Sequence, residues 1–177
     1  TILRLIETDN HIKDTNTTGT LEYAFYPSVE HGEGTYYYVD MILGNNGKLT
    51  MTPATGLKIS KAVDETMTGT TETFTFTITA PGVSGNYPFV HYAPNGTQIS
   101  PVNSVVLFNN GVAHVTLNAG ESIYIVDLPT GSYTVTENTT GKVYKIKSIN
   151  GTEGMKQITL NVATQKIEEA TFVNTLK

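Results

Sequence analysis

Apolar residues recur at every second position through most of this chain, and this alternation constrains the fold more than any other feature of the sequence. The segment 72–79 is an example, because Phe74, Phe76 and Ile78 alternate with threonines. Side chains that repeat with a period of two lie on one face of a β-strand. No window keeps the helical period for three turns, so the sequence predicts an all-β protein with little helix.

Glycine, asparagine and proline separate the alternating segments, as is typical of short strands joined by turns. Asn-Gly pairs begin at Asn46, Asn95, Asn110 and Asn150, and such pairs supply the left-handed backbone of tight hairpins. The predicted architecture is an antiparallel, immunoglobulin-like β-sandwich. The predicted strands are 2–7, 21–26, 35–43, 48–52, 57–63, 72–79, 102–108, 112–117, 122–127, 132–137, 143–149, 156–163 and 167–176.

A turn-rich stretch at 52–56 predicts a boundary between two regions. Residues 56–177 suffice for one sandwich domain. Residues 1–55 carry about four strands, too few for a sandwich of about 100 residues. We therefore expect 1–55 to be a smaller N-terminal β region, either part of a truncated domain, extra strands packed on the sandwich, or an element that pairs with another chain.

Composition excludes several classes of function. Only 15% of the 177 residues are charged, and the net charge of −5 is spread without a basic patch, which argues against a nucleic-acid partner. No apolar run approaches the length of a membrane span, so we expect no membrane contact. No signal peptide opens the sequence, and we expect it to be a processed or recombinant piece of a longer protein. Cysteine is absent.

Three polar residues share the alternation of apolar neighbours. Lys61 follows Leu57 and Ile59 at a period of two, Glu137 follows Tyr133 and Val135, and Asn174 follows Phe172, as the strings Leu57-Lys-Ile-Ser-Lys61, Tyr133-Thr-Val-Thr-Glu137 and Phe172-Val-Asn174 show. All three side chains are therefore predicted to point into the core. A buried ammonium or carboxylate without a partner costs several kcal/mol, so the three need mutual pairing or chemistry.

Simpler interpretations of the same residues stay open at this point. Lys61 could be an edge lysine that deters strand pairing with other molecules. Glu137 could be solvated at a strand end, and Asn174 could lie in a frayed terminus. Lys58 and Asp127 are rival candidates for the buried lysine and the buried acid, and both are less favoured. Lys58 is out of phase with Leu57 and Ile59, and Asp127 stands before Leu-Pro, where an aspartate is typical of a turn.

Four strings in order carry a resemblance to a known family: Leu57-Lys-Ile-Ser-Lys61-Ala-Val63, Phe74-Thr-Phe-Thr-Ile78, the stretch 119–137 and Phe172-Val-Asn174. With them, residues 57–177 resemble the Cna protein B-type domains and the related pilin isopeptide-linkage domains of Gram-positive surface proteins. The resemblance implies an intramolecular isopeptide bond between Lys61 and Asn174, promoted by Glu137. Burial would favour a neutral Lys61 amine and a protonated Glu137, which would polarise the Asn174 amide oxygen and relay a proton to the departing ammonia.

This resemblance implies a structural stalk or shaft module of an adhesin or pilus, located at the cell surface or cell wall, whose partners are neighbouring domains or pilin subunits. No cofactor and no metal site are expected, since the four histidines have no metal-ligand spacing. No enzyme activity is expected beyond a single self-crosslinking turnover. The alternative function is a module that binds a glycan or a host protein, with Tyr36 and Tyr38 as candidate binding residues.

Overall fold

The computed structural model describes residues 2–6, 12–14, 23–25, 38–43, 47, 49–101 and 104–177. Apart from the 3₁₀ turn η1 (Glu65–Met67), the regular elements of this part of the chain are strands, so the predicted all-β sandwich is confirmed. The strands are β1 (Ile2–Ile6), β2 (Ile12–Asp14), β3 (Tyr23–Phe25), β4 (Tyr38–Leu43), β5 (Leu49–Pro53), β6 (Gly56–Val63), β7 (Thr73–Thr79), β8 (Gly85–Tyr92), β9 (Val105–Phe108), β10 (Val112–Asn118), β11 (Ser122–Val126), β12 (Gly131–Glu137), β13 (Tyr144–Ile149), β14 (Thr152–Glu153), β15 (Gln157–Val162) and β16 (Ile167–Leu176).

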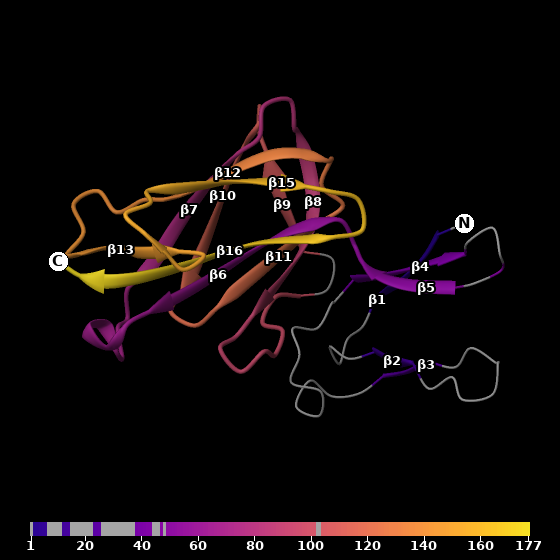
Figure 1. Cartoon of the computed structure of the whole chain (residues 1–177), viewed down its shortest axis with the longest axis horizontal. Coiled ribbons are helices and arrows are strands. Elements are labelled where there is room, and N and C mark those ends of the chain that lie inside the picture. Colours follow the sequence, from indigo (N-terminus) through magenta and orange to yellow (C-terminus); the bar gives the residue numbers. More distant parts are fainter. Residues whose placement is uncertain are drawn as a thin grey trace.

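Two sheets form the layers of the sandwich (Figure 1). One has the strand order β10-β7-β12-β15 and the other the order β14-β13-β16-β6-β11-β8-β9. Alternate residues of each sheet fill the space between them; Phe74, Phe76 and Ile78 of β7 are fully buried there. The apolar residues that recur at every second position thus form one hydrophobic core between the two sheets.

The first and last strands of the sandwich lie side by side in the middle of the larger sheet. β6 and β16 pair in parallel, with Lys61 opposite Phe172 and Val63 opposite Asn174. All other strand pairs among the described residues are antiparallel. Because parallel neighbours need a long connection, this pair joins segments separated by nearly the whole sandwich. The sequence patterns did not predict this pairing.

Two of the Asn-Gly pairs adopt the predicted tight turn. Asn110 and Gly111 have φ values of 49° and 81°, and Asn150 and Gly151 have 48° and 78°. Positive φ at both central residues defines the hairpin turn that matches the twist of the flanking strands. These turns join β9 to β10 and β13 to β14.

The strand β8 is not among those predicted from the sequence. Its segment contains Asn86 and Pro88, which interrupt a β pattern, although Val90 and Tyr92 are buried. Position 88 is nevertheless tolerated, because β8 pairs with β11 only from Phe89 onward, so Pro88 has no β11 partner that would need its missing N–H. The short strands β2 and β14 were also missed.

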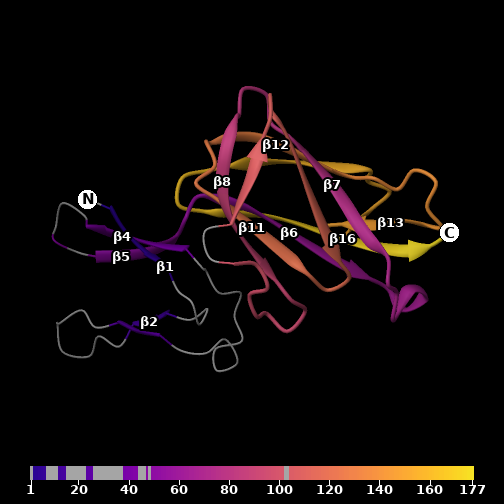
Figure 2. The ribbon, with the colours of Figure 1, turned by 180° about the vertical axis from the view of Figure 1, so that it is seen from behind.

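The N-terminal strands form the sheet β1-β4-β5 and the pair β2-β3, at the end of the molecule opposite the C-terminus (Figures 1 and 2). The end of β5 and the link to β6 form hydrogen bonds with the sandwich. Tyr124 Oη donates to the Ala54 carbonyl, Thr52 Oγ1 donates to Gln165 Oε1 at 2.7 Å, and the Gln165 N–H donates to Thr55 Oγ1 at 2.8 Å. The predicted division into 1–55 and 56–177 stays a prediction.

Gly56 begins β6 where the chain passes closely over β11. A Cβ atom built on Gly56 would lie 2.1 Å from the Ile125 carbonyl oxygen and 2.8 Å from Tyr124 Cε2. The carbonyl is part of the sheet and cannot move aside freely. We therefore expect Gly56→Ala to lower the free energy of unfolding by about 2 to 3 kcal/mol, measured by urea denaturation. Gly154→Ala is the contrasting variant, because no atom lies within 4 Å of its added Cβ and only its positive φ opposes the change.

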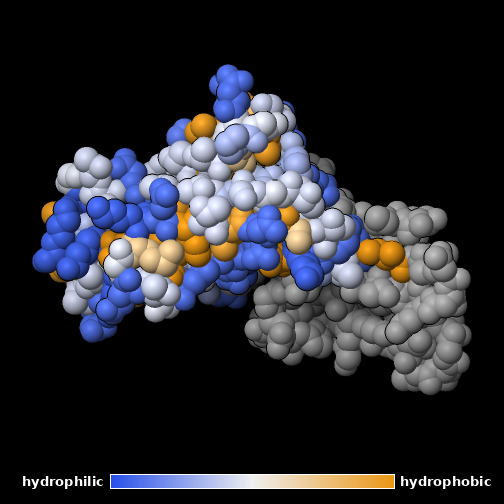
Figure 3. All heavy atoms as spheres, turned by 45° about the horizontal axis from the view of Figure 1, so that its top comes forward, coloured by the Kyte–Doolittle hydropathy of each residue, from blue (hydrophilic) through white to orange (hydrophobic). Residues whose placement is uncertain are grey.

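Hydrophobic residues on the face seen in Figure 3 are interspersed with polar ones. Among the large apolar side chains that are most exposed, Val105 and Leu107 share the edge strand β9, whereas Ile99, Val143 and Leu176 lie on three other segments. Within the described part of the chain, no helix has the length and apolar character needed to cross a bilayer.

Candidate functional site

Lys61, Glu137 and Asn174 all point into the core, as the alternation predicts. Their exposed fractions are 2%, 4% and 0%. Lys61 and Asn174 come from the parallel neighbours β6 and β16 of the larger sheet, and Glu137 ends β12 in the smaller sheet. The sandwich therefore brings a carboxyl group from one layer against an amine and an amide from the other.

Glu137 contacts both partners with its two carboxyl oxygens. Lys61 Nζ lies 3.4 Å from Glu137 Oε2, and Asn174 Nδ2 donates to Glu137 Oε1 at 2.5 Å. The side chains of Lys61 and Glu137 are fully shielded from solvent. The interpretations of an edge lysine, a solvated glutamate and a frayed asparagine are therefore wrong.

Aromatic rings surround this polar group. Lys61 Nζ lies 4.4 Å from the centre of the Phe74 ring. Phe76, the β7 residue opposite Glu137, packs edge-on against Phe172 at 5.0 Å between ring centres. The rings exclude water, so the electrostatic interactions inside are stronger than at a surface.

Burial shifts the pKa values of Lys61 and Glu137 towards their neutral forms. Desolvation lowers the pKa of Lys61 to about 8, although the charge and hydrogen bond of Glu137 act in the opposite direction. Desolvation also raises the pKa of Glu137, against the opposing effects of Lys61 and Asn174. Moving one proton from the amine to the carboxylate then gives a nucleophilic amine beside a carboxylic acid.

The lowered pKa of Lys61 predicts a pH dependence in a protein that cannot form a crosslink. Burial lowers the pKa of Lys61 to about 8 in the folded chain, against 10.5 for an unburied lysine, and we expect the same difference in Asn174→Ala. The unfolded state binds more protons between these values, so the free energy of unfolding should rise with pH, by about 1 to 3 kcal/mol. Below pH 8 the native lysine is charged, so burial of its ammonium group lowers the free energy of unfolding by the full amount.

Urea denaturation at pH 8 and pH 10 would measure this change. The control is the double variant Lys61→Met/Asn174→Ala, in which residue 61 does not titrate. The rise should be present in the single variant and absent from the control. A stability difference between the two that is constant or falls with pH would contradict a lowered Lys61 pKa.

One detail of the site differs from the expected chemistry. The structure places the amide nitrogen of Asn174, rather than its oxygen, against Glu137. Asn174 Oδ1 is buried and has no hydrogen-bond partner. In this arrangement Glu137 is positioned to protonate the nitrogen that would leave as ammonia, and the amide oxygen needs a different donor.

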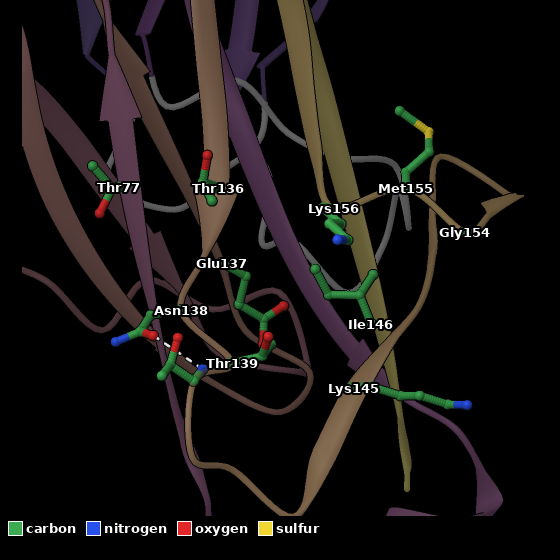
Figure 4. Close-up of a pocket in the computed structure, with 11 residues that line it drawn as sticks. Thr77, Thr136, Glu137, Asn138, Thr139, Lys145, Ile146, Gly154, Met155 and Lys156 are labelled. Carbon is green, nitrogen blue, oxygen red and sulfur yellow. Dashed lines mark hydrogen bonds between the residues drawn. The ribbon is translucent and has the colours of Figure 1, made fainter.

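A groove of about 590 Å³ opens beside Glu137 at one end of the sandwich (Figure 4). Its walls come from the strands that flank the β12–β13 loop and from the β14–β15 turn, and they include Thr136, Lys145, Ile146 and Met155. Glu137 belongs to the lining, although its side chain is solvent-shielded. The groove thus brings solvent close to the carboxyl group of an otherwise closed site.

The rival residues lie outside this cluster. Lys58 is half-buried, with Nζ 5.9 Å from the centre of the Tyr92 ring. Asp127 is exposed and adopts a left-handed φ of 60° in the turn between β11 and β12. Phase thus separates Lys61 from Lys58, whereas Asp127 shares the phase of Ile123 and Ile125 and is set apart from Glu137 by its position in an exposed turn.

Other candidate residues are not joined to the cluster. Tyr36 lies outside the described residues, and of Tyr38 only the backbone, in β4, is described. His91 contacts Glu121 at 2.9 Å, and His114 contacts Thr77 at 3.2 Å. Within the described ranges, no group of three His, Cys, Asp or Glu side chains could hold a metal ion.

Tyr144 of β13, which was not among the predicted site residues, is fully buried near the cluster. Its ring centre lies 5.1 Å from that of Phe74, the ring beneath Lys61. Burial, followed by the charges of Glu137 and Glu72, raises the pKa of Tyr144 to about 12. Tyr144 and Ile146 alternate with Lys145 and Lys147, so the period of two was a signal that could have placed this tyrosine in the core; the pattern breaks only after Ile146, where the register with β16 shifts.

A family model described as "Domain of unknown function (DUF7601)" matches residues 55–176, about two-thirds of the chain. The chain belongs to this family. The matched part of the DUF7601 chain contains the sandwich strands and all three residues of the buried cluster. No curated protein matches the sequence.

Solved structures similar to this DUF7601 protein include pilus proteins. A pilus-presented adhesin, Spy0125 (Cpa), matches with a TM-score of 0.55 and 21% identity over 79% of this chain and 37% of that chain. The P212121 form of this adhesin matches with a TM-score of 0.53 and 22% identity over 78% of this chain and 37% of that chain. The major pilin from Streptococcus pyogenes gives 0.48 and 22%, over 78% and 61%.

At these identities, the adhesin structures show a shared fold. The DUF7601 chain spans just over a third of the length of the adhesin chains it matches. The resemblance to Cna protein B-type domains, and the roles of Lys61, Glu137 and Asn174, remain predictions.

Proposed function

We propose that this DUF7601 sandwich is a structural module of a Gram-positive surface fibre, locked by an isopeptide bond between Lys61 and Asn174. The observation that carries the proposal is the buried Glu137 carboxyl group, which contacts both the Lys61 amine and the Asn174 amide. A buried cation, acid and amide in mutual contact are a costly arrangement if their only role is packing. A reaction that removes the charges explains why they are together.

The reaction needs no co-reactant. A proton moves from Lys61 Nζ to Glu137, and the neutral amine attacks Asn174 Cγ. The carbonyl electrons move to Oδ1, and Glu137 passes its proton to Nδ2 while accepting another from Nζ. When the C–Nδ2 bond breaks, ammonia leaves and an amide joins Cγ to Nζ. The groove beside Glu137 supports this scheme, because it offers the ammonia a short way out.

The function of the bond follows from its position. It joins the first and last strands of the sandwich, which already lie side by side. In the chain-entropy model, closing a loop on the order of 100 residues stabilises a protein by about 4 to 5 kcal/mol. Such a module resists unfolding, proteolysis and tension, as a stalk or shaft at the cell surface or cell wall must. Its partners would be neighbouring domains or pilin subunits.

Intact-mass measurement of the folded protein tests the proposal. We expect a mass lower than the sequence value by one ammonia. Lys61→Ala and Asn174→Ala should each show the full sequence mass, whereas Lys58→Ala should still lose ammonia, because Lys58 lies outside the cluster. A wild-type protein at its full sequence mass would refute the crosslink.

The alternative function, binding of a glycan or a host protein, depended on Tyr36 and Tyr38. No observation on the described residues favours it over the structural role. Loss of glycan-array binding upon substitution of these tyrosines would support it. The two functions are compatible, since a locked sandwich is also a rigid scaffold for binding.

A further inference from the structure

Two buried side-chain atoms in the described part of the chain have no hydrogen-bond partner: Tyr144 Oη and Asn174 Oδ1. One is a hydroxyl that can donate a proton and the other is a carbonyl oxygen that can only accept one. An unpartnered buried polar group destabilises the fold, so both are expected to have a reason to be there.

These two groups without hydrogen-bond partners belong to adjacent strands. Asn174 of β16 stands opposite Ile146 of β13, and Tyr144 lies two residues before Ile146. Tyr144 is therefore the diagonal neighbour of Asn174 in the antiparallel pair. Diagonal neighbours are within reach of aromatic side chains.

Tyr144 also contacts one of the aromatic rings that surround Lys61, Glu137 and Asn174. Its ring packs on Phe74, and the Phe74 ring also contacts Lys61 Nζ. The raised pKa of Tyr144, to which Glu137 contributes, keeps the hydroxyl protonated and able to donate. Glu137 cannot serve the amide oxygen in this arrangement, because its contacts go to Lys61 Nζ and Asn174 Nδ2.

We propose that the Tyr144 hydroxyl stabilises the oxyanion that forms at Asn174 Oδ1 during isopeptide formation. This inference depends on the proposed crosslink. As Lys61 Nζ attacks Cγ, the carbonyl electrons move to Oδ1, and the new negative charge attracts the Tyr144 O–H. When the C–Nδ2 bond breaks, the carbonyl reforms and ammonia leaves, so Tyr144 neither gains nor loses a proton overall. A donor that is unpaired in the ground state and paired at the oxyanion favours the transition state specifically.

Tyr144→Phe removes the hydroxyl and leaves the ring packing intact. The full chain would be made in a cell-free system and quenched at intervals, and intact mass would give the fraction that has lost ammonia. We expect crosslinking to slow by about 10-fold to 100-fold; loss of an oxyanion donor typically costs about 100-fold or more, and Glu137 still relays the proton. The matched control is Tyr133→Phe, since Tyr133 is a buried tyrosine whose hydroxyl already donates to the Pro129 carbonyl at 2.6 Å. This control should crosslink at the wild-type rate.

Thermal unfolding in the Lys61→Ala background separates this role from a structural one. There, Tyr144→Phe should leave Tm unchanged or higher, because it removes an unpartnered buried hydroxyl. Slower crosslinking with an undiminished Tm supports the proposal. If Tyr144→Phe crosslinks at the wild-type rate, the proposed role of Tyr144 is wrong, although the Lys61–Asn174 crosslink itself is supported. If crosslinking slows and Tm also falls, the proposed role is again wrong, because the defect is then structural. A wild-type chain that never loses ammonia overturns both proposals.

Discussion

Glu137→Ala is expected to abolish the crosslink and to cause the largest loss of stability of any single substitution in the cluster. The variant should have the full sequence mass, one ammonia above the wild type. Without the bond, about 4 to 5 kcal/mol of stabilisation is lost. Lys61 would also remain buried without its acid partner, which adds to the loss. A total of at least about 5 kcal/mol corresponds to a decrease in Tm on the order of 15 °C in a domain of this size.

Intact mass and differential scanning calorimetry would measure these two effects. The matched control is Asp127→Asn, which neutralises the rival acid in its exposed turn and keeps a residue type that tolerates its positive φ. This control should stay crosslinked, with a Tm close to that of the wild type. A Glu137→Ala protein that still lacks one ammonia would mean that another group promotes the reaction.

Mechanical extension is the second experiment with a large expected effect. In a single-molecule pulling experiment between the two chain ends, the wild-type sandwich should not extend between residues 61 and 174. Force enters through β6 and leaves through β16, the two strands that the bond would join. In Glu137→Ala, unfolding releases roughly 110 residues at 3.6 Å each, so an additional extension of about 40 nm should appear.

The control for this experiment is Lys58→Ala, which should lack the 40 nm step, as the wild type does. Asn174→Ala should show the step, because the amide that Lys61 would attack is missing. A wild-type molecule that shows the full step would lack the covalent path between β6 and β16. The same molecules analysed by intact mass would show whether the bond had failed to form.

The sequence predicted the strands of the sandwich well where alternation was uninterrupted. β7 and β16 differ from their predicted bounds by one residue or none, because apolar and polar residues alternate through their buried centres. β8 was missed because Asn86 and Pro88 obscure its pattern, and its place in the sheet depends on pairing with β9 and β11. Contacts between distant segments decided that strand, and local propensity did not.

What the sequence by itself determined is which face each side chain takes. The period of two directs Lys61, Glu137 and Asn174 into the core and keeps Lys58 out of it, since neighbouring residues of a strand point to opposite faces. Only the tertiary structure decided what these three meet there. The parallel pairing of β6 with β16 and the packing of β12 across the sandwich depend on long-range contacts, and they place the carboxyl group between the amine and the amide nitrogen. The same packing leaves the Asn174 oxygen and the Tyr144 hydroxyl without partners, which no local pattern can encode because the two groups come from different strands.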